Sequence, residues 1–235
     1  MAKYVIDEST LTAIADSIRS KKGTTGSIVP EKMPEEIAGI ETGGGDSDFP
    51  DGFKRCDFIQ FSGSSWIDTG IIGTQETQIV ASFTWESSTQ RHLLGCVSAD
   101  NTASITAYMN GSFRFGNKST SKSFSSSAKN PMLPYSLLLN KTTIGVTNSV
   151  TSISDVNDFE TVGTLLIGGA RDSDGSLPAV GIVGKVYRFA IWNGGELVRK
   201  FVPVTDGNGV YRFFDLVSKE FFDSITSTPL DGGNL

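Results

Sequence analysis

Short segments of alternating apolar and polar residues fill most of the chain, and the clearest of them lie near its C-terminal end. Val183 to Trp192 is rich in β-branched and aromatic residues, a composition typical of a strand. The Asn-Gly-Gly sequence that follows favours the positive φ angles of a tight type I′ hairpin turn. Leu197 to Val204 and Val210 to Leu216 are predicted as the next two strands. The pattern therefore predicts an antiparallel meander.

The side-chain period of two indicates which face of each strand meets a core. In Thr77 to Trp85 the face carrying Ile79, Ala81, Phe83 and Trp85 is apolar, so all four are predicted to be core residues. In the first strand of the meander, one face carries Tyr187, Phe189 and Ile191, and the other carries Val186, Arg188, Ala190 and Trp192. We expect the first of these faces on the core and the second partly in solvent.

The remaining strands are short and regularly spaced. They are predicted at Cys56–Phe61, Trp66–Ile71, His92–Val97, Ser104–Asn110, Ser112–Phe115, Tyr135–Asn140, Thr142–Thr147 and Thr164–Gly168. The Ser-rich segment Ser119–Lys129 has no apolar period and is predicted as a long loop or an edge segment. No helical crossover pattern follows residue 50. The fold class is therefore predicted as mainly β, a sandwich rather than a parallel α/β fold.

The first 40 residues have a helical period instead. Leu11, Ile14, Ala15 and Ile18 recur at helical spacing, and a second short helix is predicted from Pro30 to Ile40. Two helices this short bury too little surface alone, so we expect them to pack on a partner, on copies of themselves or on the sandwich. We divide the chain into a helical module at 1–42, a Gly-rich linker at 43–53 and a sandwich at 54–235.

Charge and hydropathy exclude several functions. The net charge is −6, and the first 50 residues hold 5 basic and 9 acidic side chains. Neither part has the basic surplus of a protein that binds nucleic acid. No apolar run is long enough for a transmembrane helix, and no signal peptide follows Met1, so we expect no membrane insertion and no general secretion.

Metal and disulfide chemistry have little support. Cys56 and Cys96 are too few for a disulfide framework, and we favour free buried thiols over a single bridge between neighbouring strands. The one histidine, His92, cannot form a His-rich metal site, and neither CxxC nor HExxH occurs.

Catalysis is not expected. Related sandwiches that hydrolyse β-glucans carry paired carboxylates on one strand. None of the glutamates after residue 50 has an acid at i+2 or i+4; they are Glu76, Glu86, Glu160, Glu196 and Glu220. A pair assembled from distant strands stays open as an alternative.

Three segments of the β part carry a family resemblance: FIQFSGSSWIDTGI (Phe58–Ile71), LLIGGARDSDG (Leu165–Gly175) and the meander Gly184–Phe222. They resemble the concanavalin A-like, laminin-G-like jelly rolls of bacteriophage and prophage proteins. The segment Leu11–Ile40 is similar to a short helical module of phage tail and baseplate proteins. Asp68 and Asp215 match recurrent positions of the jelly rolls, where we interpret both as structural carboxylates near turns.

The resemblance implies a phage tail or baseplate receptor-binding protein that is homo-oligomeric and recognises a bacterial surface carbohydrate. Residues 1–42 would attach it to other tail or baseplate proteins. It would be made in the bacterial cytoplasm and end in the virion tail, which agrees with the missing signal peptide. Two alternatives stay open: a structural virion protein that makes only protein contacts, and a glycan hydrolase.

Candidate ligand residues are chosen for sugar chemistry, which needs an exposed aromatic face beside fixed polar groups. Trp192 lies at a strand end beside Asn193 and on the same face as Arg188, although a packing role for Trp192 stays open. Tyr108, Arg114 and Asn117 flank one hairpin, where alternate polar residues could line a groove.

Calcium is the one cofactor that the resemblance raises. Asp172 and Asp174 alternate before Gly175 like the opening of a calcium loop, and laminin-G-like domains often bind calcium at a rim. The later acidic position of such a loop is missing. We therefore favour a turn in which these carboxylates bond local N–H groups, and otherwise expect no cofactor.

Overall fold

The structure is a computed structural model. It describes Thr12, residues 14–19 and 28–29, and residues 49–234 except 87–90, 110–111, 118–120, 124–133, 148, 155 and 179–180. The chain divides into two compact units, Met1–Asp48 and Phe49–Leu235. Within the described residues, no helix has the length and apolar content needed to cross a membrane.

The first unit contains one short helix among its described residues. It includes Thr12 and residues 14–19, and it buries Ala15 and Ile18 beside Ile28 while Ile14 is exposed. The expected two-helix module is therefore not supported. The described helix is about two turns long and buries only two apolar side chains, too little to define a packed pair of helices. The second expected helix, Pro30–Ile40, lies outside the described residues.

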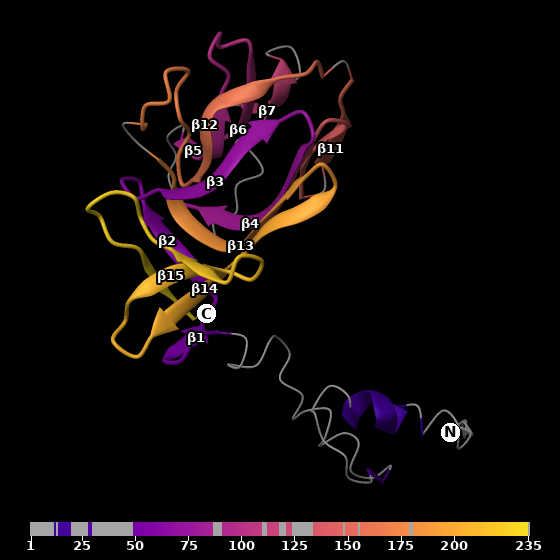
Figure 1. The fold of residues 1–235 in the computed structure, drawn as a ribbon, viewed down its shortest axis with the longest axis vertical. Helices are drawn as coiled ribbons and strands as arrows, with labels where there is room; N and C mark the ends of the chain where they lie inside the picture. The colour runs from indigo at the N-terminus through magenta and orange to yellow at the C-terminus, as the bar shows by residue number, and fades with distance from the viewer. Residues whose placement is uncertain are drawn as a thin grey trace. The chain divides into compact units, whose positions relative to one another are not determined.

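The second unit is a sandwich of two antiparallel sheets (Figure 1). The larger sheet has the order β11-β10-β9-β4-β13-β14-β15-β16, with β1 on β14, β2 on β13 and β17 on β2. Its strands are β1 (Phe53–Arg55), β2 (Phe58–Ser62), β4 (Thr77–Trp85), β9 (Tyr135–Asn140), β10 (Thr143–Val146), β11 (Ser149–Ser152), β13 (Val183–Asn193), β14 (Glu196–Asp206), β15 (Tyr211–Asp215), β16 (Glu220–Phe222) and β17 (Asp231–Gly233).

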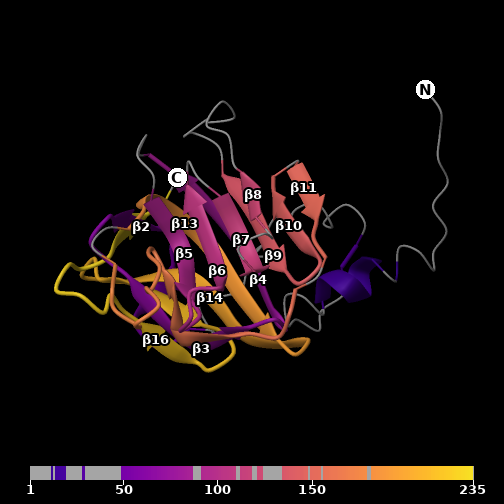
Figure 2. The same ribbon diagram turned by 90° about the horizontal axis from the view of Figure 1, so that it is seen from above.

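The smaller sheet has the order β3-β12-β5-β6-β7-β8. Its strands are β3 (Ile67–Thr74), β12 (Glu160–Ile167), β5 (Arg91–Val97), β6 (Ala103–Met109), β7 (Ser112–Asn117) and β8 (Ser121–Ser123). Figure 2 shows β5, β6 and β7 side by side in one layer, with β13 and β4 in the other. The mainly β sandwich expected from the sequence is thus present.

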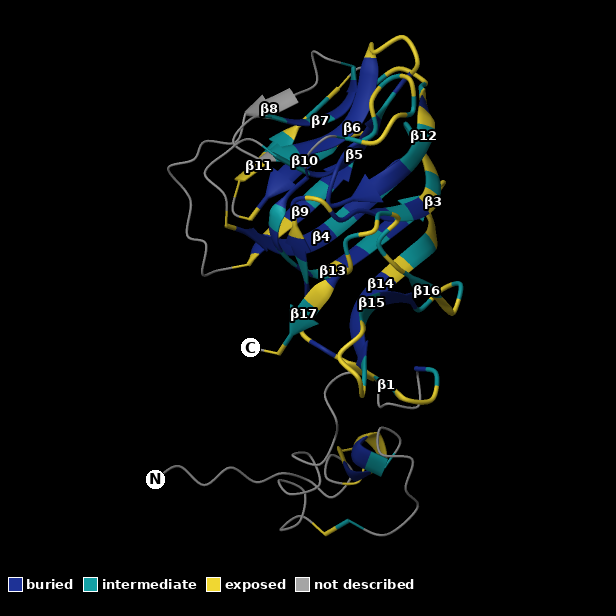
Figure 3. Cartoon of the chain, turned by 90° about the vertical axis from the view of Figure 1, so that its left-hand side faces the viewer, coloured by how far each residue is buried: buried dark blue, intermediate teal, exposed yellow. Residues whose placement is uncertain are grey.

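The core lies between the two sheets and is built from the strand faces that the alternation predicts. Ile79, Ala81, Phe83 and Trp85 of β4 are all buried, as expected. Ile105, Ala107, Phe113 and Phe115 close the core from the smaller sheet. Figure 3 shows these buried strands in dark blue at the centre of the sandwich. Cys56 and Cys96 are buried free thiols, which confirms the interpretation that we favoured.

One predicted face of β13 is wrong. Val186 is fully buried together with Phe189 and Ile191, whereas Tyr187 is half-buried and its ring lies 6.1 Å from that of Phe58. The pairing of β13 with β4 shifts between Val186 and Arg188. Because this β-bulge inserts one extra residue, side chains before the bulge point to the opposite face from the one that a strict alternation counted from Phe189 predicts.

The turn after β13 has the predicted type with a different pair of central residues. Asn193 pairs with Glu196, and the positive φ angles belong to Gly194 (59°) and Gly195 (86°). Two consecutive positive φ angles define a type I′ hairpin. The meander β13-β14-β15 follows as predicted and continues into β16.

A second apolar cluster joins the start of the second unit to the meander. Phe49 packs edge-on against Phe214, with ring centroids 5.8 Å apart, and Val202 and Val204 complete the buried part. Phe53 in β1 lies 4.4 Å from Phe221. Phe49 and Phe53, which the composition assigns to the linker, therefore contact the sandwich.

Candidate binding groove

Three neighbouring strands of the smaller sheet place a row of polar side chains on its outer face. The register sets His92 of β5 opposite Tyr108 of β6, and Thr106 of β6 opposite Arg114 of β7. Because Ile105 and Ala107 point into the core, Ser104, Thr106 and Tyr108 point to the other face.

A β-bulge in β5 sets the position of His92. The pairing with β6 shifts between His92 and Leu94, and both Leu93 and Leu94 are fully buried. The extra residue lets two consecutive leucines enter the core and returns His92 to the outer face. Bulges next to binding sites commonly re-aim a side chain in this way.

The outer face is hollowed where these strands meet. The hollow has a volume of about 200 Å³ and is lined by His92, Val97, Asn101, Ala103, Ser104, Thr106, Tyr108, Ser112 and Arg114. We call it the outer groove. It is smaller than the roughly 300–1,000 Å³ of sites for drug-sized ligands, so its size suits one small polar unit.

Three polar atoms in the outer groove are buried without a hydrogen-bond partner among the described residues. They are Nδ1 of His92, Oγ of Ser104 and Nε of Arg114. Ser104 as a whole is only 5% exposed. Buried polar atoms in folded proteins are nearly always paired, and each unpaired one costs about 1–3 kcal/mol. All three residues line the same hollow, which indicates a place for a polar ligand.

The charge of the outer groove is positive and comes from Arg114. No Asp or Glu is among the described residues that line the groove. Burial, with a smaller contribution from the positive charge of Arg114, lowers the pKa of His92 to about 4. The imidazole is therefore neutral at neutral pH and can both donate and accept a hydrogen bond. Asp100, which shares a hairpin with Asn101, directs its carboxylate to Ser98 and Thr102.

An aromatic pair forms one side of the groove. The rings of His92 and Tyr108 lie 4.4 Å apart at 38° to each other. Both residues are half-buried, so part of the pair faces the hollow. Aromatic surface beside hydroxyl and guanidinium groups is the combination that a sugar ring requires, because the ring has apolar C–H faces and a polar edge.

The structure does not bring the six predicted ligand residues together. Tyr108 and Arg114 line the outer groove, while Asn117 lies at the end of β7, opposite Ala103, and is not part of the lining. The other three belong to β13 in the other sheet.

Trp192 lines a different hollow of about 450 Å³, with Gln78, Asn140 and the ion pair of Glu76 with Lys141 (2.7 Å). Oδ1 of Asn193 accepts a hydrogen bond from Thr74 (3.3 Å) and Arg188 is exposed; neither residue lines that hollow. The described part of this hollow has no buried unpaired polar atom, in contrast to the outer groove.

The proposed calcium residues lie on a turn after β12 that is held by its own hydrogen bonds. Gly175 N–H donates to the carbonyl of Asp172 (2.9 Å), and Oδ1 of Asp174 accepts from Ser176 N–H (2.8 Å). Hydrogen bonds from Ser176 also hold the pKa of Asp174 below its ordinary value. Within the described residues, no three His, Cys, Asp or Glu side chains are grouped so as to hold a metal ion.

The side chain of Arg171 links this turn to β12 and to Asp68 of β3. Its guanidinium donates to the carbonyls of Thr164 (3.2 Å) and Gly175 (3.0 Å) and pairs with Asp68 (2.7 Å). Burial alone would raise the pKa of Asp68, but hydrogen bonds from Thr164, Gly70 and Arg171 bring it below the ordinary value. The positive charge that balances the carboxylate of Asp68 is thus the guanidinium of Arg171.

Sequence reasoning missed three groups of the outer groove: the hydroxyls of Ser104, Thr106 and Ser112, the imidazole of His92, and Asn101. The alternation of Ser104, Thr106 and Tyr108 with Ile105 and Ala107 was a readable signal for the hydroxyls. His92 had no such signal, because the bulge that places it follows from tertiary packing of two leucines.

No protein-family model matches the chain, and a search of the curated proteins finds no match.

Proposed function

We propose that the sandwich is a glycan-binding module and that the outer groove is its binding site. The observation that carries the proposal is that one small hollow is lined by three residues that each hold a buried, unpaired polar atom: Nδ1 of His92, Oγ of Ser104 and Nε of Arg114. A sugar unit would supply hydroxyl donors and acceptors to these atoms and stack a C–H face against the His92–Tyr108 pair.

We further propose that the sandwich is a concanavalin A-like jelly roll and that the protein is a receptor-binding component of a phage tail or baseplate. The support is the resemblance of Phe58–Ile71, Leu165–Gly175 and Gly184–Phe222, together with a sandwich that contains these segments in β2, β3, β12 and the meander. In this proposal the first unit attaches the protein to other tail components and to copies of itself, and the virion is its place of action.

The test is binding of the full-length protein to bacterial cells and to extracted wall polysaccharides. We expect saturable binding that a defined sugar competes away. Ser104→Ala and His92→Gln should each weaken it about 5- to 100-fold, because each removes one hydrogen bond to a buried site.

Arg188→Gln is the matched control, since Arg188 is exposed on β13 of the other sheet. The groove variants must also keep the far-ultraviolet spectrum and the unfolding midpoint near those of the parent protein. Binding that survives the groove variants unchanged would refute the groove. No binding at all, by a folded protein on any host surface, would favour a sandwich that makes only protein contacts.

A further inference from the structure

We infer that the unit bound in the outer groove is an anionic sugar, in which a carboxylate or phosphate oxygen pairs with Arg114 and ring hydroxyls bond His92 and Ser104. This inference rests on the proposed function and states what kind of glycan the groove selects. The charge of the site, the pairing of the other arginines and the size of the hollow support it.

Arg114 and Arg91 differ from the other half-buried arginines of the sandwich, which form ion pairs. Arg171 pairs with Asp68 at 2.7 Å, Arg199 with Asp215 at 3.6 Å, and Arg212 with Asp223 at 3.1 Å. Arg114 has no ion pair with any described residue, and its Nε is buried without a partner. Arg91, directly before His92, also lacks an ion pair among those residues, so the nearby strand end adds positive charge.

A half-buried guanidinium with a buried, unpaired Nε is costly, and an oxyanion is the partner that relieves the cost most completely. Guanidinium groups bind carboxylates and phosphates through parallel N–H donors, and such charge-assisted bonds are about twice as strong as neutral ones. The rest of the groove cannot supply this charge, because its described lining holds hydroxyl, amide and imidazole groups and no carboxylate.

The net charge of the protein limits where an anion can bind. At −6 the protein as a whole repels anions, so a preference for an anion must come from a local site. The same charge argues against Arg114 as part of a broad basic surface for a polyanion such as nucleic acid.

The remaining lining suits a sugar ring rather than a free inorganic ion. Thr106 and Ser112 add hydroxyls on either side of Arg114, and the His92–Tyr108 pair offers ring surface. A single charged sugar unit fits a hollow of about 200 Å³. Uronates and sugar phosphates share this chemistry and differ in the group that carries the charge.

The experiment compares probes that differ only in charge, with the full-length protein. Glucose, glucuronate and glucose 1-phosphate form one set, galactose and galacturonate a second, and acetate and inorganic phosphate serve as simple anions. Calorimetry gives the affinities. The imidazole of His92, the one histidine of the chain, gives an NMR signal that reports occupancy of the groove.

We expect at least one acidic sugar to bind about tenfold or more tightly than its neutral counterpart and to shift the His92 signal. Arg114→Gln should remove this preference, Arg114→Lys should keep part of it, and Arg188→Gln should leave it unchanged. Tighter binding of glucuronate or galacturonate would place the charge on a carboxylate, and tighter binding of glucose 1-phosphate would place it on a phosphate.

Four results would overturn the inference. Equal affinity for neutral and acidic sugars, with the His92 signal shifted by both, would leave the groove a glycan site without anion selectivity. Simple anions that bind as tightly as the acidic sugars would show that the groove binds anions without recognising the sugar. A preference that survives in Arg114→Gln would assign it to another residue. If the protein binds bacterial cells but no probe shifts the His92 signal, the groove is not the binding site.

Discussion

His92 is the residue at which the physical state of the outer groove can be measured directly. Its pKa of about 4 arises mainly from burial and secondly from the charge of Arg114, which faces it from β7. The buried imidazole stays neutral because burial disfavours its charged form. One ring nitrogen can therefore donate a hydrogen bond and the other can accept one. A protonated imidazole beside Arg114 would repel the guanidinium and compete for the same anion.

This assignment predicts a specific pH dependence of stability. The folded pKa of His92 lies below the ordinary value of 6.5, so between pH 6.5 and about 4 the unfolded chain binds a proton that the folded chain does not. The free energy of unfolding should therefore fall as the pH falls through this window, by up to about 3 kcal/mol from this group, and level off below it.

Urea unfolding of the parent and of His92→Gln at several pH values measures the effect, since carboxylates titrate in both proteins and cancel in the difference. NMR titration of the imidazole gives the pKa itself. In Arg114→Gln the pKa should rise only part of the way towards 6.5, because burial is the larger cause. A parent pKa near 6.5 would contradict the buried, neutral imidazole.

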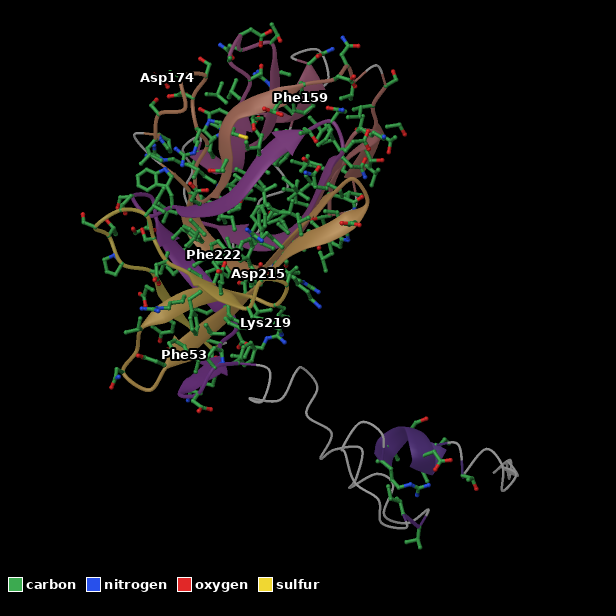
Figure 4. All side chains as sticks on the ribbon, in the orientation of Figure 1. Phe53, Phe159, Asp174, Asp215, Lys219 and Phe222 are labelled. Atoms are coloured by element: carbon green, nitrogen blue, oxygen red, sulfur yellow. The ribbon has the colours of Figure 1, made fainter. Side chains whose placement is uncertain are left out.

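At the scale of elements, the meander is held together by a buried carboxylate at the turn between β15 and β16. Asp215 is completely buried and accepts hydrogen bonds from the N–H groups of Lys200 (2.6 Å), Val217 (3.1 Å) and Ser218 (3.1 Å). The turn ends at Lys219, which has a positive φ of 61° and whose N–H donates to the carbonyl of Asp215 (2.9 Å). Figure 4 labels Asp215 and Lys219 in this part of the sandwich.

Asp215→Asn should destabilise the protein by about 2–4 kcal/mol, because one acceptor oxygen becomes a donor facing N–H groups and the charge opposite Arg199 is lost. Asp206→Asn is the matched control. Asp206 accepts hydrogen bonds from Asn208 and Val210 N–H through one oxygen at an exposed turn, where asparagine can do the same, so this variant should lose clearly less stability than Asp215→Asn. Urea unfolding compares the two variants, and equal losses would contradict a special role for Asp215.

The elements also show which features a sequence can predict. Thr77–Trp85 and Tyr135–Asn140 were predicted with the bounds that the structure has, because each alternates without interruption between clear turns. The predicted faces were wrong for Val186 and Tyr187 of β13 and right for Phe189 and Ile191, and the position of His92 was missed for the same reason. A bulge inserts one residue, and its position depends on packing against strands far away in the sequence.

Only two residues of the candidate site, Tyr108 and Arg114, were predicted from the sequence. Tyr108 and Arg114 were found because they flank one hairpin, so their proximity is local. The sequence could not show whether Trp192 lies near Tyr108 and Arg114. That depends on which strands share a sheet, and β13 belongs to one sheet while β6 and β7 belong to the other. Ser104 is an ordinary residue in the sequence and is distinguished only by its burial beside Arg114.

At the scale of the whole molecule, the boundary between the two units lies earlier than composition suggests. The Gly-rich composition predicted a linker up to residue 53, whereas contacts divide the chain between Asp48 and Phe49. Phe49 is 9% exposed, and β1 pairs with β14 from Phe53 to Arg55. Glycine content marks where a chain can bend, but two aromatic rings suffice to bind the end of such a segment to a sheet.

Two fragments of the second unit test this boundary. A fragment of residues 49–235 should fold and keep the His92 signal of the full-length protein. A fragment of residues 54–235 loses the rings of Phe49 and Phe53 from the cluster with Phe214 and Phe221, and so should be less stable by about 3–5 kcal/mol. Phe49→Ala in the longer fragment should cause roughly half of that loss, and thermal and urea unfolding give the values.

The outer groove should be unaffected in both fragments, because β5, β6 and β7 belong to the other sheet. The shorter fragment should therefore bind the same sugar with the same affinity below its unfolding temperature. Equal stability of the two fragments would show that Phe49 and Phe53 contribute little and that the linker does extend to residue 53. A change in affinity at full folding would instead show that the two sheets are coupled through the core, and the groove would then depend on contacts far from its own three strands.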